Sequence, residues 1–241
     1  MRLIIIRHGD PDYENDTVTE KGKREVELLA KRMKNEPVDA IYVSPLGRAK
    51  DTARPTEVAL GIDAVVCDWL REFSYETVDL PYKKNAICWD LLPEFVNTCE
   101  DIYSPTRWRE VPFIKKSGIP SAYDNVTGEL DKLLAEYGYV REGYSYRAVK
   151  PSHKTVVLVC HYGVTAVLLS RLLNCSPYSI WNNCVTLPTS VTVLNTEERR
   201  DGIASFRMSK MGDTSHLYAD GEPDSFAARF CECYSDDTRH G

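Results

Sequence analysis

The chain has 241 residues, of which 43% are hydrophobic and 27% charged, an ordinary globular mixture with enough apolar material for a substantial core. Its 30 basic and 36 acidic residues give a net charge of −6 at pH 7. This acidic balance argues against general binding to nucleic acid or to anionic membranes, and we expect neither as a partner.

No segment has the pattern of a targeting signal or membrane span. Residues 1–6 are apolar, but Arg7 and His8 follow at once, which leaves no signal-peptide core. The apolar stretch 156–169 contains His161 and is too short to cross a bilayer. A cytoplasmic location is therefore expected.

The cysteines are scattered and include no CxxC pair, so we expect reduced thiols rather than a disulfide framework. They stand at positions 67, 88, 99, 160, 175, 184, 231 and 233. Cys231 and Cys233, near His216, come nearest to a metal-site pattern but lack the paired spacing of structural zinc sites. We expect no metal and no cofactor.

Strands and helices alternate along the first seventy residues. Residues 2–6 form a continuous apolar run, typical of a strand buried on both faces. Thr19 is a good N-cap for a helix over 20–34, and a second strand is expected over 40–43. Ser44 and Pro45 then resemble a helix start, with Ser44 as the cap, and Pro55 should kink or break that helix. A third strand over 64–67 completes the pattern.

The middle of the chain, residues 73–152, has weak periodicity and is interpreted as an inserted cap region, called the insertion below. A helix is expected over 123–137. The earlier pattern then returns, with a strand over 155–160, a helix over 162–173 and strands over 190–195 and 203–208. This alternation predicts a single α/β domain over 1–241, a three-layer α/β/α sandwich with a mostly parallel central sheet.

The polar tail, residues 212–241, contains three possible apolar anchors, Phe226, Phe230 and Tyr234. They would pack on the same subunit or on a second copy, so a homodimer is one of the arrangements considered.

Cationic side chains follow the predicted strands at the same edge of the sheet. Arg7 and His8 end the first strand, Arg48 lies at the start of the helix after the second, and His161 lies between a strand and a helix. Ligands of open α/β sheets bind beyond the carboxyl ends of the strands, where helix N-termini also favour anions. These residues predict a phosphate pocket.

Four ordered motifs resemble the histidine phosphatase superfamily, which includes cofactor-dependent phosphoglycerate mutase and many small phosphomonoesterases. They are Arg7-His8-Gly9 with Thr19-Glu20-x-Gly22, Ser44-Pro45-Leu46-Gly47-Arg48-Ala49, Leu70-x-Glu72, and His161-Tyr162-Gly163-Val164. In the last motif Tyr162 stands where the family usually has glycine directly after histidine, so the backbone geometry there is open to question.

The resemblance implies a role for each matching residue. His8 would be the nucleophile that becomes phosphohistidine, while Arg7, Arg48 and His161 would bind the phosphoryl oxygens. Glu72 would protonate the leaving oxygen and later activate water, so its pKa should be raised. Glu76 lies one turn further and is an alternative acid.

Other candidate residues carry weaker assignments. Asn15 is an additional candidate phosphate contact. The aromatic residues Tyr75, Trp89, Trp108 and Phe113 are expected to form the core of the insertion rather than to contact substrate.

The expected function is metal-independent hydrolysis of a small phosphorylated metabolite through phosphohistidine. The alternatives are a phosphoglycerate mutase-type phosphotransferase and a non-catalytic phosphate-binding module. The mutase's Glu-Arg-His-Tyr-Gly stretch is replaced here by Glu72-Phe73-Ser74-Tyr75-Glu76, which favours hydrolysis. Basic residues of the insertion are candidates to bind a second anionic group on the substrate, namely Arg107, Arg109, Lys115 and Lys116.

Overall fold

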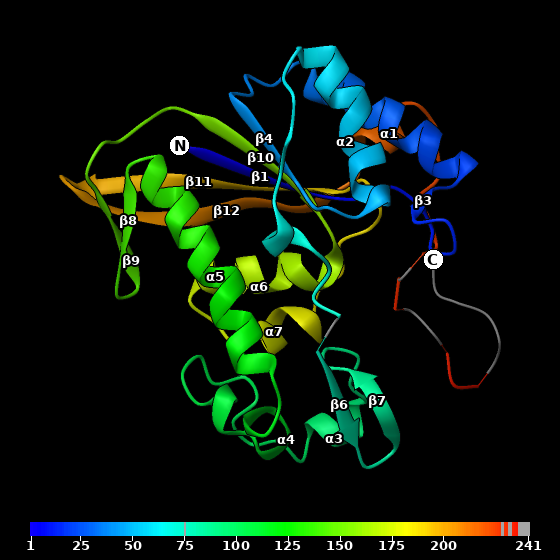
Figure 1. The fold of residues 1–241 in the computed structure, drawn as a ribbon, viewed down its shortest axis with the longest axis vertical. Helices are drawn as coiled ribbons and strands as arrows, with labels where there is room; N and C mark the ends of the chain where they lie inside the picture. The colour runs from blue at the N-terminus through cyan, green and yellow to red at the C-terminus, as the bar shows by residue number, and fades with distance from the viewer. Residues whose placement is uncertain (75, 228, 231–232, 236–241) are drawn as a thin grey trace.

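An eight-stranded sheet forms the centre of the protein, in a computed structural model that describes all residues except 75, 228, 231–232 and 236–241 (Figure 1). From edge to edge its strands are β5 (Val65–Val66), β4 (Ala40–Val43), β10 (Thr155–Cys160), β1 (Arg2–Arg7), β11 (Val191–Arg200), β12 (Ile203–Asp213), β9 (Ser145–Ala148) and β8 (Tyr139–Glu142). Two small hairpins lie outside it, β2 (Pro11–Asp12) with β3 (Thr17–Val18) and β6 (Thr77–Leu80) with β7 (Lys83–Ile87).

Helices cover both faces of this sheet, which confirms the predicted α/β sandwich (Figure 1). The α-helices are α1 (Glu20–Met33), α2 (Gly47–Leu60), α3 (Pro93–Val96), α4 (Pro112–Lys115), α5 (Ile119–Glu136), α6 (Tyr162–Leu173), α7 (Pro177–Trp181) and α8 (Ser215–Ala219). Short 3₁₀ helices span Asp68–Leu70 and Trp108–Glu110.

The sheet is parallel in one half and antiparallel in the other. Strands β5, β4, β10 and β1 run parallel, whereas β11, β12, β9 and β8 pair antiparallel. The parallel half is the one predicted from alternating strands and helices. The other half consists of hairpins, which need no crossover helix and so leave no such pattern in the sequence.

Strand β1 contributes to two hydrophobic cores because its side chains alternate between the faces of the sheet. Ile4 and Ile6 pack with α1 and α2, and Leu3 and Ile5 pack on the opposite face with α5 and α6. Its continuous apolar run is thus explained by burial on both faces, and this burial fixes the position of the residues that follow the strand.

Three local predictions need correction. Helix α2 begins at Gly47, not at Ser44, and it continues through Pro55 to Leu60. No side chain of the preceding residues caps it; instead Asp16 Oδ2 accepts a hydrogen bond from the Gly47 amide at 2.7 Å. The third strand, β5, is an exposed edge strand rather than a buried one.

The insertion contributes to the main layers as well as standing apart from them. Helix α5 covers the same face of the sheet as α6, and the β8–β9 hairpin extends the sheet beyond β12 (Figure 1). Residues 77–118, with β6, β7, α3 and α4, project from the sandwich as an outer segment (Figure 1).

A buried carboxyl on α1 supports the loop that follows β1. Glu25 Oε2 accepts a hydrogen bond from the Asp10 amide at 2.9 Å, and Lys21 Nζ lies 3.6 Å from Oε1. Burial outweighs these contacts and raises the pKa of Glu25 from 4.5 to about 7. Between pH 4.5 and about 7 the folded protein therefore keeps a proton on Glu25 that the unfolded chain has lost.

We predict that Glu25→Gln stabilises the protein at pH 8 more than at pH 5. Because the folded-state pKa is raised, wild-type stability falls as the pH rises from about 4.5 to 7, by up to about 3 kcal/mol, and Gln removes this loss. Thermal unfolding at both pH values measures it, with the exposed Glu27→Gln as the matched control. An equal effect of Glu25→Gln at both pH values would contradict the prediction.

Candidate active site

The two predicted histidines meet at the carboxyl ends of neighbouring parallel strands. His8 follows β1 and His161 follows β10, and the two strands pair in register up to Arg7 and Cys160. The imidazole rings lie 5.0 Å apart between centroids, and both are buried. Arg48 reaches the same place from the first turn of α2, so the sheet brings together segments far apart in the sequence.

His8 is held as a neutral imidazole with Nε2 available. Its Nδ1 lies 2.8 Å from the carbonyl oxygen of Gly9, so the proton is on Nδ1, the nitrogen that must donate. Burial holds the pKa of His8 well below its usual value, and Arg7 and Arg48 lower it further. A neutral ring with a lone pair on Nε2 is the form that a nucleophilic histidine requires.

Each guanidinium is anchored through Nη1, and Arg7 also has a side-chain hydrogen bond with Tyr13. Arg7 Nη1 donates to the carbonyl of Thr186 at 2.6 Å, and Arg48 Nη1 lies 2.6 Å from Asp16 Oδ1. The Nε atoms of both arginines are buried, and no described residue accepts a hydrogen bond from either. An unpaired buried donor costs about 1–3 kcal/mol, so these groups favour an acceptor from outside the protein.

Ser44 is a hydrogen-bond partner of His161, a contact that we did not expect from its helix-start motif. Ser44 Oγ lies 2.7 Å from His161 Nε2, with both side chains fully buried. Burial, together with the nearby His8 and arginines, holds the pKa of His161 well below its usual value. We assign the serine hydroxyl as the donor to Nε2, which puts the proton of the neutral ring on Nδ1; this nitrogen is buried and has no hydrogen-bond partner among the described residues.

Glu72 lies over the N-terminus of α6. Its Oε1 accepts hydrogen bonds from the amides of Phe73 at 2.7 Å and Val164 at 3.0 Å, and also from Gly163. Burial raises the pKa of Glu72 despite these donors and the nearby Arg7, which lower it. Backbone amides from two segments thus orient the carboxyl.

The tyrosine that departs from the family pattern turns its side chain away from Glu72. The Tyr162 hydroxyl reaches the carbonyl oxygens of Trp181 at 2.6 Å and Cys184 at 2.9 Å. Its ring lies beside Arg7, with 6.0 Å from Cζ to the ring centroid. The amides of the residues after it face Glu72, so the inserted side chain leaves the helix N-terminus open to the carboxyl.

Two other candidates lie away from this cluster. Asn15 is exposed on the loop between β2 and β3, where its Nδ2 donates to Asp12 Oδ2 at 2.8 Å. Glu76 packs against Gly118, where an added Cβ would lie 2.2 Å from Glu76 Oε2. The structure thus brings Arg7, His8, Arg48, Glu72 and His161 together without these two.

The loop before β11 supports the residues that end β1. The Thr189 amide donates to the carbonyl of His8 at 3.1 Å, in a backbone conformation with φ of 57° that a β-branched residue rarely adopts. His216 Nε2 lies 3.2 Å from Thr189 Oγ1 and so buttresses the loop. No sequence motif marked Thr186 or Thr189, because Thr186 contacts Arg7 and Thr189 contacts His8 through backbone atoms.

The C-terminal tail packs against helix α1 and the loop that follows β1. Glu222 pairs with Lys21 at 2.9 Å and with Arg24 at 3.0 Å on α1, and the Ser225 hydroxyl donates to Asp10. Phe230, further along, lies against Tyr162, with 5.4 Å between ring centroids. The tail therefore packs on its own subunit beside the site.

Neither a metal cluster nor a membrane span is found among the residues that the structure describes. No group of three or more His, Cys, Asp or Glu side chains there is placed to hold a metal ion. No helix of this part of the chain is long and apolar enough to cross a membrane. Tyr75 and Cys231, considered above, lie outside the described residues.

Comparison with known proteins agrees with this geometry. The model of the histidine phosphatase superfamily, branch 1, matches residues 3–89. Phosphoserine phosphatase 1 of Hydrogenobacter thermophilus is 24% identical over 231 residues, covering 90% of this chain and 94% of that protein. A probable phosphatase of Schizosaccharomyces pombe is 23% identical over 236 residues, covering 90% of this chain and 95% of its own.

Solved structures share the fold. A phosphoserine phosphatase variant from Entamoeba histolytica, in complex with phosphoserine, superposes with a TM-score of 0.59 at 18% identity, covering 90% of this chain and 98% of that one. A mycobacterial glucosyl-3-phosphoglycerate phosphatase gives 0.54 at 21% identity, covering 87% and 98%. The chain is thus similar to the histidine phosphatase superfamily over the segment that contains His8, Arg48 and Glu72, and it shares its fold with solved phosphatase structures.

We predict that Ser44→Ala lowers kcat/KM by about tenfold or more, because His161 then loses the donor that keeps its proton on Nδ1. Steady-state kinetics measure the loss, and ¹⁵N chemical shifts of the His161 ring report the tautomer. Ser190→Ala is the matched control, since Ser190 Oγ is also buried but has no hydrogen-bond partner among the described residues. Wild-type kinetics with an unchanged tautomer would contradict this role for Ser44.

Proposed function

We propose that the chain is a metal-independent phosphomonoesterase in which residues 1–241 form one catalytic domain. The observation that carries this proposal is the set of three buried side-chain nitrogens without a hydrogen-bond partner among the described residues, Arg7 Nε, Arg48 Nε and His161 Nδ1, close to a neutral His8. A phosphoryl group would satisfy all three with its equatorial oxygens and place its phosphorus in front of His8 Nε2.

The first half-reaction transfers the phosphoryl group to His8. Nε2 attacks the phosphorus in line with the ester oxygen, the P–O bond to the alcohol breaks, and an N–P bond forms. The arginines stabilise the negative charge on the equatorial oxygens. Glu72, protonated because burial raises its pKa, delivers its proton to the leaving oxygen.

The second half-reaction returns the enzyme to its starting state. Glu72, now a carboxylate, removes a proton from a water molecule as that water attacks the phosphorus. The N–P bond breaks, inorganic phosphate leaves, and His8 again carries a single proton on Nδ1 beside the Gly9 carbonyl. The same carboxyl thus serves as acid and then as base.

The charge distribution of the insertion favours a small monoanionic or uncharged alcohol over one with a second phosphate. Three of the four basic residues considered for a second anion are paired on the surface: Arg107 with Asp101 at 2.7 Å, Arg109 with Asp124 at 2.6 Å, and Lys115 with Glu110 at 2.6 Å. The relatives named as phosphoserine phosphatases support a small phosphorylated metabolite as substrate.

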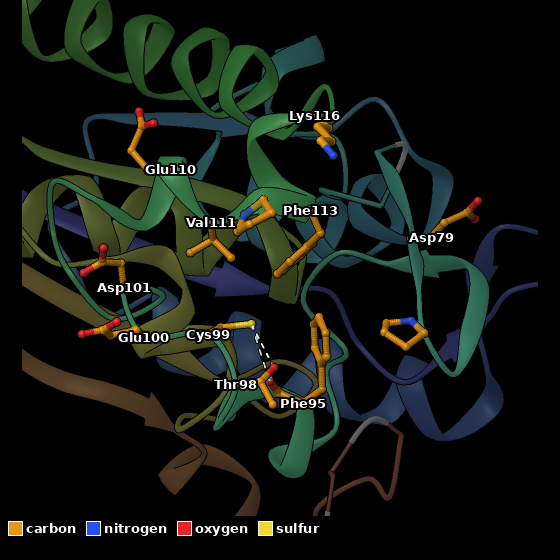
Figure 2. Close-up of a pocket in the computed structure, with 12 residues that line it drawn as sticks. Asp79, Phe95, Thr98, Cys99, Glu100, Asp101, Glu110, Val111, Phe113 and Lys116 are labelled. Carbon is orange, nitrogen blue, oxygen red and sulfur yellow. Dashed lines mark hydrogen bonds between the residues drawn. The ribbon is translucent and has the colours of Figure 1, made fainter.

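A cavity of about 600 Å³ lies within the outer segment of the insertion, away from the catalytic residues (Figure 2). Phe95, Phe113 and Val111 form its apolar wall, and Lys116 with several carboxylates surrounds them (Figure 2). None of the five residues gathered at the strand ends lines it, so we do not assign it to the reacting phosphate.

We predict that His8→Ala abolishes hydrolysis of an aryl phosphate, because no other described side chain at the site offers a neutral nucleophilic nitrogen in its place. The assay follows phosphate release in buffer containing a chelator, and acid-labile labelling of the protein by substrate phosphate should disappear together with turnover. His153→Ala, remote from the site, is the control. Retained turnover in His8→Ala would remove the nucleophile assignment.

We also predict that Glu72→Gln reduces activity most for alkyl phosphates, whose leaving oxygen needs a proton, and by about 10²–10⁴-fold. In the wild type, kcat/KM for such esters should fall at alkaline pH, as Glu72 loses its proton, and the raised pKa of Glu72 sets the pH of this fall. Glu76→Gln serves as the matched comparison. The carboxyl assignment is wrong if Glu76→Gln, rather than Glu72→Gln, shows this dependence on the leaving group.

A further inference from the structure

We propose that Trp89, in the insertion, is a positioning residue for Glu72, which it shields from water so that the carboxyl stays protonated until the leaving oxygen arrives. The inference rests on the proposed function, since it concerns the general acid of that reaction. Trp89 was expected to be part of the insertion core, and its contacts distinguish it from the other aromatic residues there.

The indole of Trp89 is fixed beside the carboxyl. Its Nε1 donates to the carbonyl of Phe73, the residue after Glu72, at 2.9 Å. A Cβ added to Gly163 would lie 2.6 Å from Trp89 Nε1 and 2.7 Å from Glu72 Oε1. The indole edge and the carboxylate therefore converge on the first turn of α6, at a place where only glycine leaves room for both.

Two further rings hold the indole in this position. Trp89 meets Tyr162 edge to face, with 5.3 Å between centroids, and Phe230 lies 6.2 Å from Trp89. We call Trp89, Tyr162 and Phe230 the aromatic cluster. Since the Tyr162 hydroxyl is anchored to two backbone carbonyls, the cluster has a fixed base on α6.

The aromatic cluster and the hydrogen bonds to Glu72 have opposite effects on the pKa of this carboxyl. Backbone donors at the helix N-terminus favour the carboxylate, whereas an apolar surface that excludes water favours the neutral acid. The net direction at Glu72 is a raised pKa, with burial as its largest cause. The edge of the Trp89 indole and Glu72 Oε1 face the same position at Gly163, so the ring fills space beside the carboxyl that water would otherwise occupy.

Three other aromatic residues of the insertion pack elsewhere. Trp108 is fully buried against Tyr123 and Tyr178, with 5.0 Å and 6.2 Å between ring centroids. Phe95 and Phe113 pack on each other in the outer segment (Figure 2). Phe95→Ala is therefore a matched control that loosens the insertion without removing the wall beside Glu72.

A double-mutant cycle tests the proposal. We compare wild type, Trp89→Ala, Glu72→Gln and the double variant on an alkyl phosphate and on an aryl phosphate with a good leaving group. We expect Trp89→Ala to lower kcat/KM for the alkyl ester about tenfold or more, to affect the aryl ester much less, and to shift the alkaline limb of the pH profile to lower pH. In the Glu72→Gln background the same change should cost nothing further.

Trp89→Phe keeps a ring but removes the hydrogen bond from the indole N–H to Phe73. The alkaline limb of the pH profile should therefore move by less than in Trp89→Ala. If Trp89→Ala does not fold, Trp89→Phe takes its place in the cycle. The proposal fails if the effects of the Trp89 and Glu72 changes multiply, or if both esters lose activity equally, or if Phe95→Ala shifts the pH profile to the same extent. Those outcomes would leave the proposed function intact. The proposed function itself fails if Glu72→Gln or His8→Ala retains full activity.

Discussion

Buried N–H donors that converge without an acceptor are the constraint on which the rest of the structure depends. Arg7 and Arg48 are each satisfied on one side, by a carbonyl and by a carboxylate, and remain unpaired at Nε. Desolvating such groups is unfavourable, so the fold must supply the compensation elsewhere. The two hydrophobic cores on either side of β1 do so, and an anion entering between the donors recovers part of the cost.

The two imidazoles show how one residue type acquires opposite functions. A backbone carbonyl fixes the proton of His8 on Nδ1 and leaves Nε2 as an electron-pair donor, whereas the Ser44 hydroxyl occupies Nε2 of His161 and leaves Nδ1–H as a hydrogen-bond donor. Both rings are neutral because burial and neighbouring guanidiniums disfavour a further positive charge. The second tautomer depends on one hydroxyl, which makes Ser44 as specific a part of the site as the ring it contacts.

The sequence predicted the parallel half of the sheet and the five residues that meet at its carboxyl edge, because continuous apolar strands and adjacent motifs determine both. It also predicted strands over 190–195 and 203–208, which are β11 and β12 of the antiparallel half, but it assigned no strands to β8 and β9, because a hairpin within the insertion carries no crossover pattern. Ser44 was interpreted as a helix cap because its partner lies 117 residues away. Trp89 and Thr189 were missed for the same reason: their contacts arise only when distant segments pack together.

The tail reaches the site through contacts of two different physical kinds. Its aromatic end packs by apolar contact, but its attachment to α1 depends on Glu222, which pairs with the partly exposed Lys21 and Arg24. Dissolved salt weakens exposed ion pairs of this type, with a screening length of about 8–10 Å at physiological ionic strength, whereas it leaves ring packing largely unaffected. The ionic strength of the surroundings therefore acts on how firmly the tail holds the turn after His8, without changing any residue that we propose to contact phosphate.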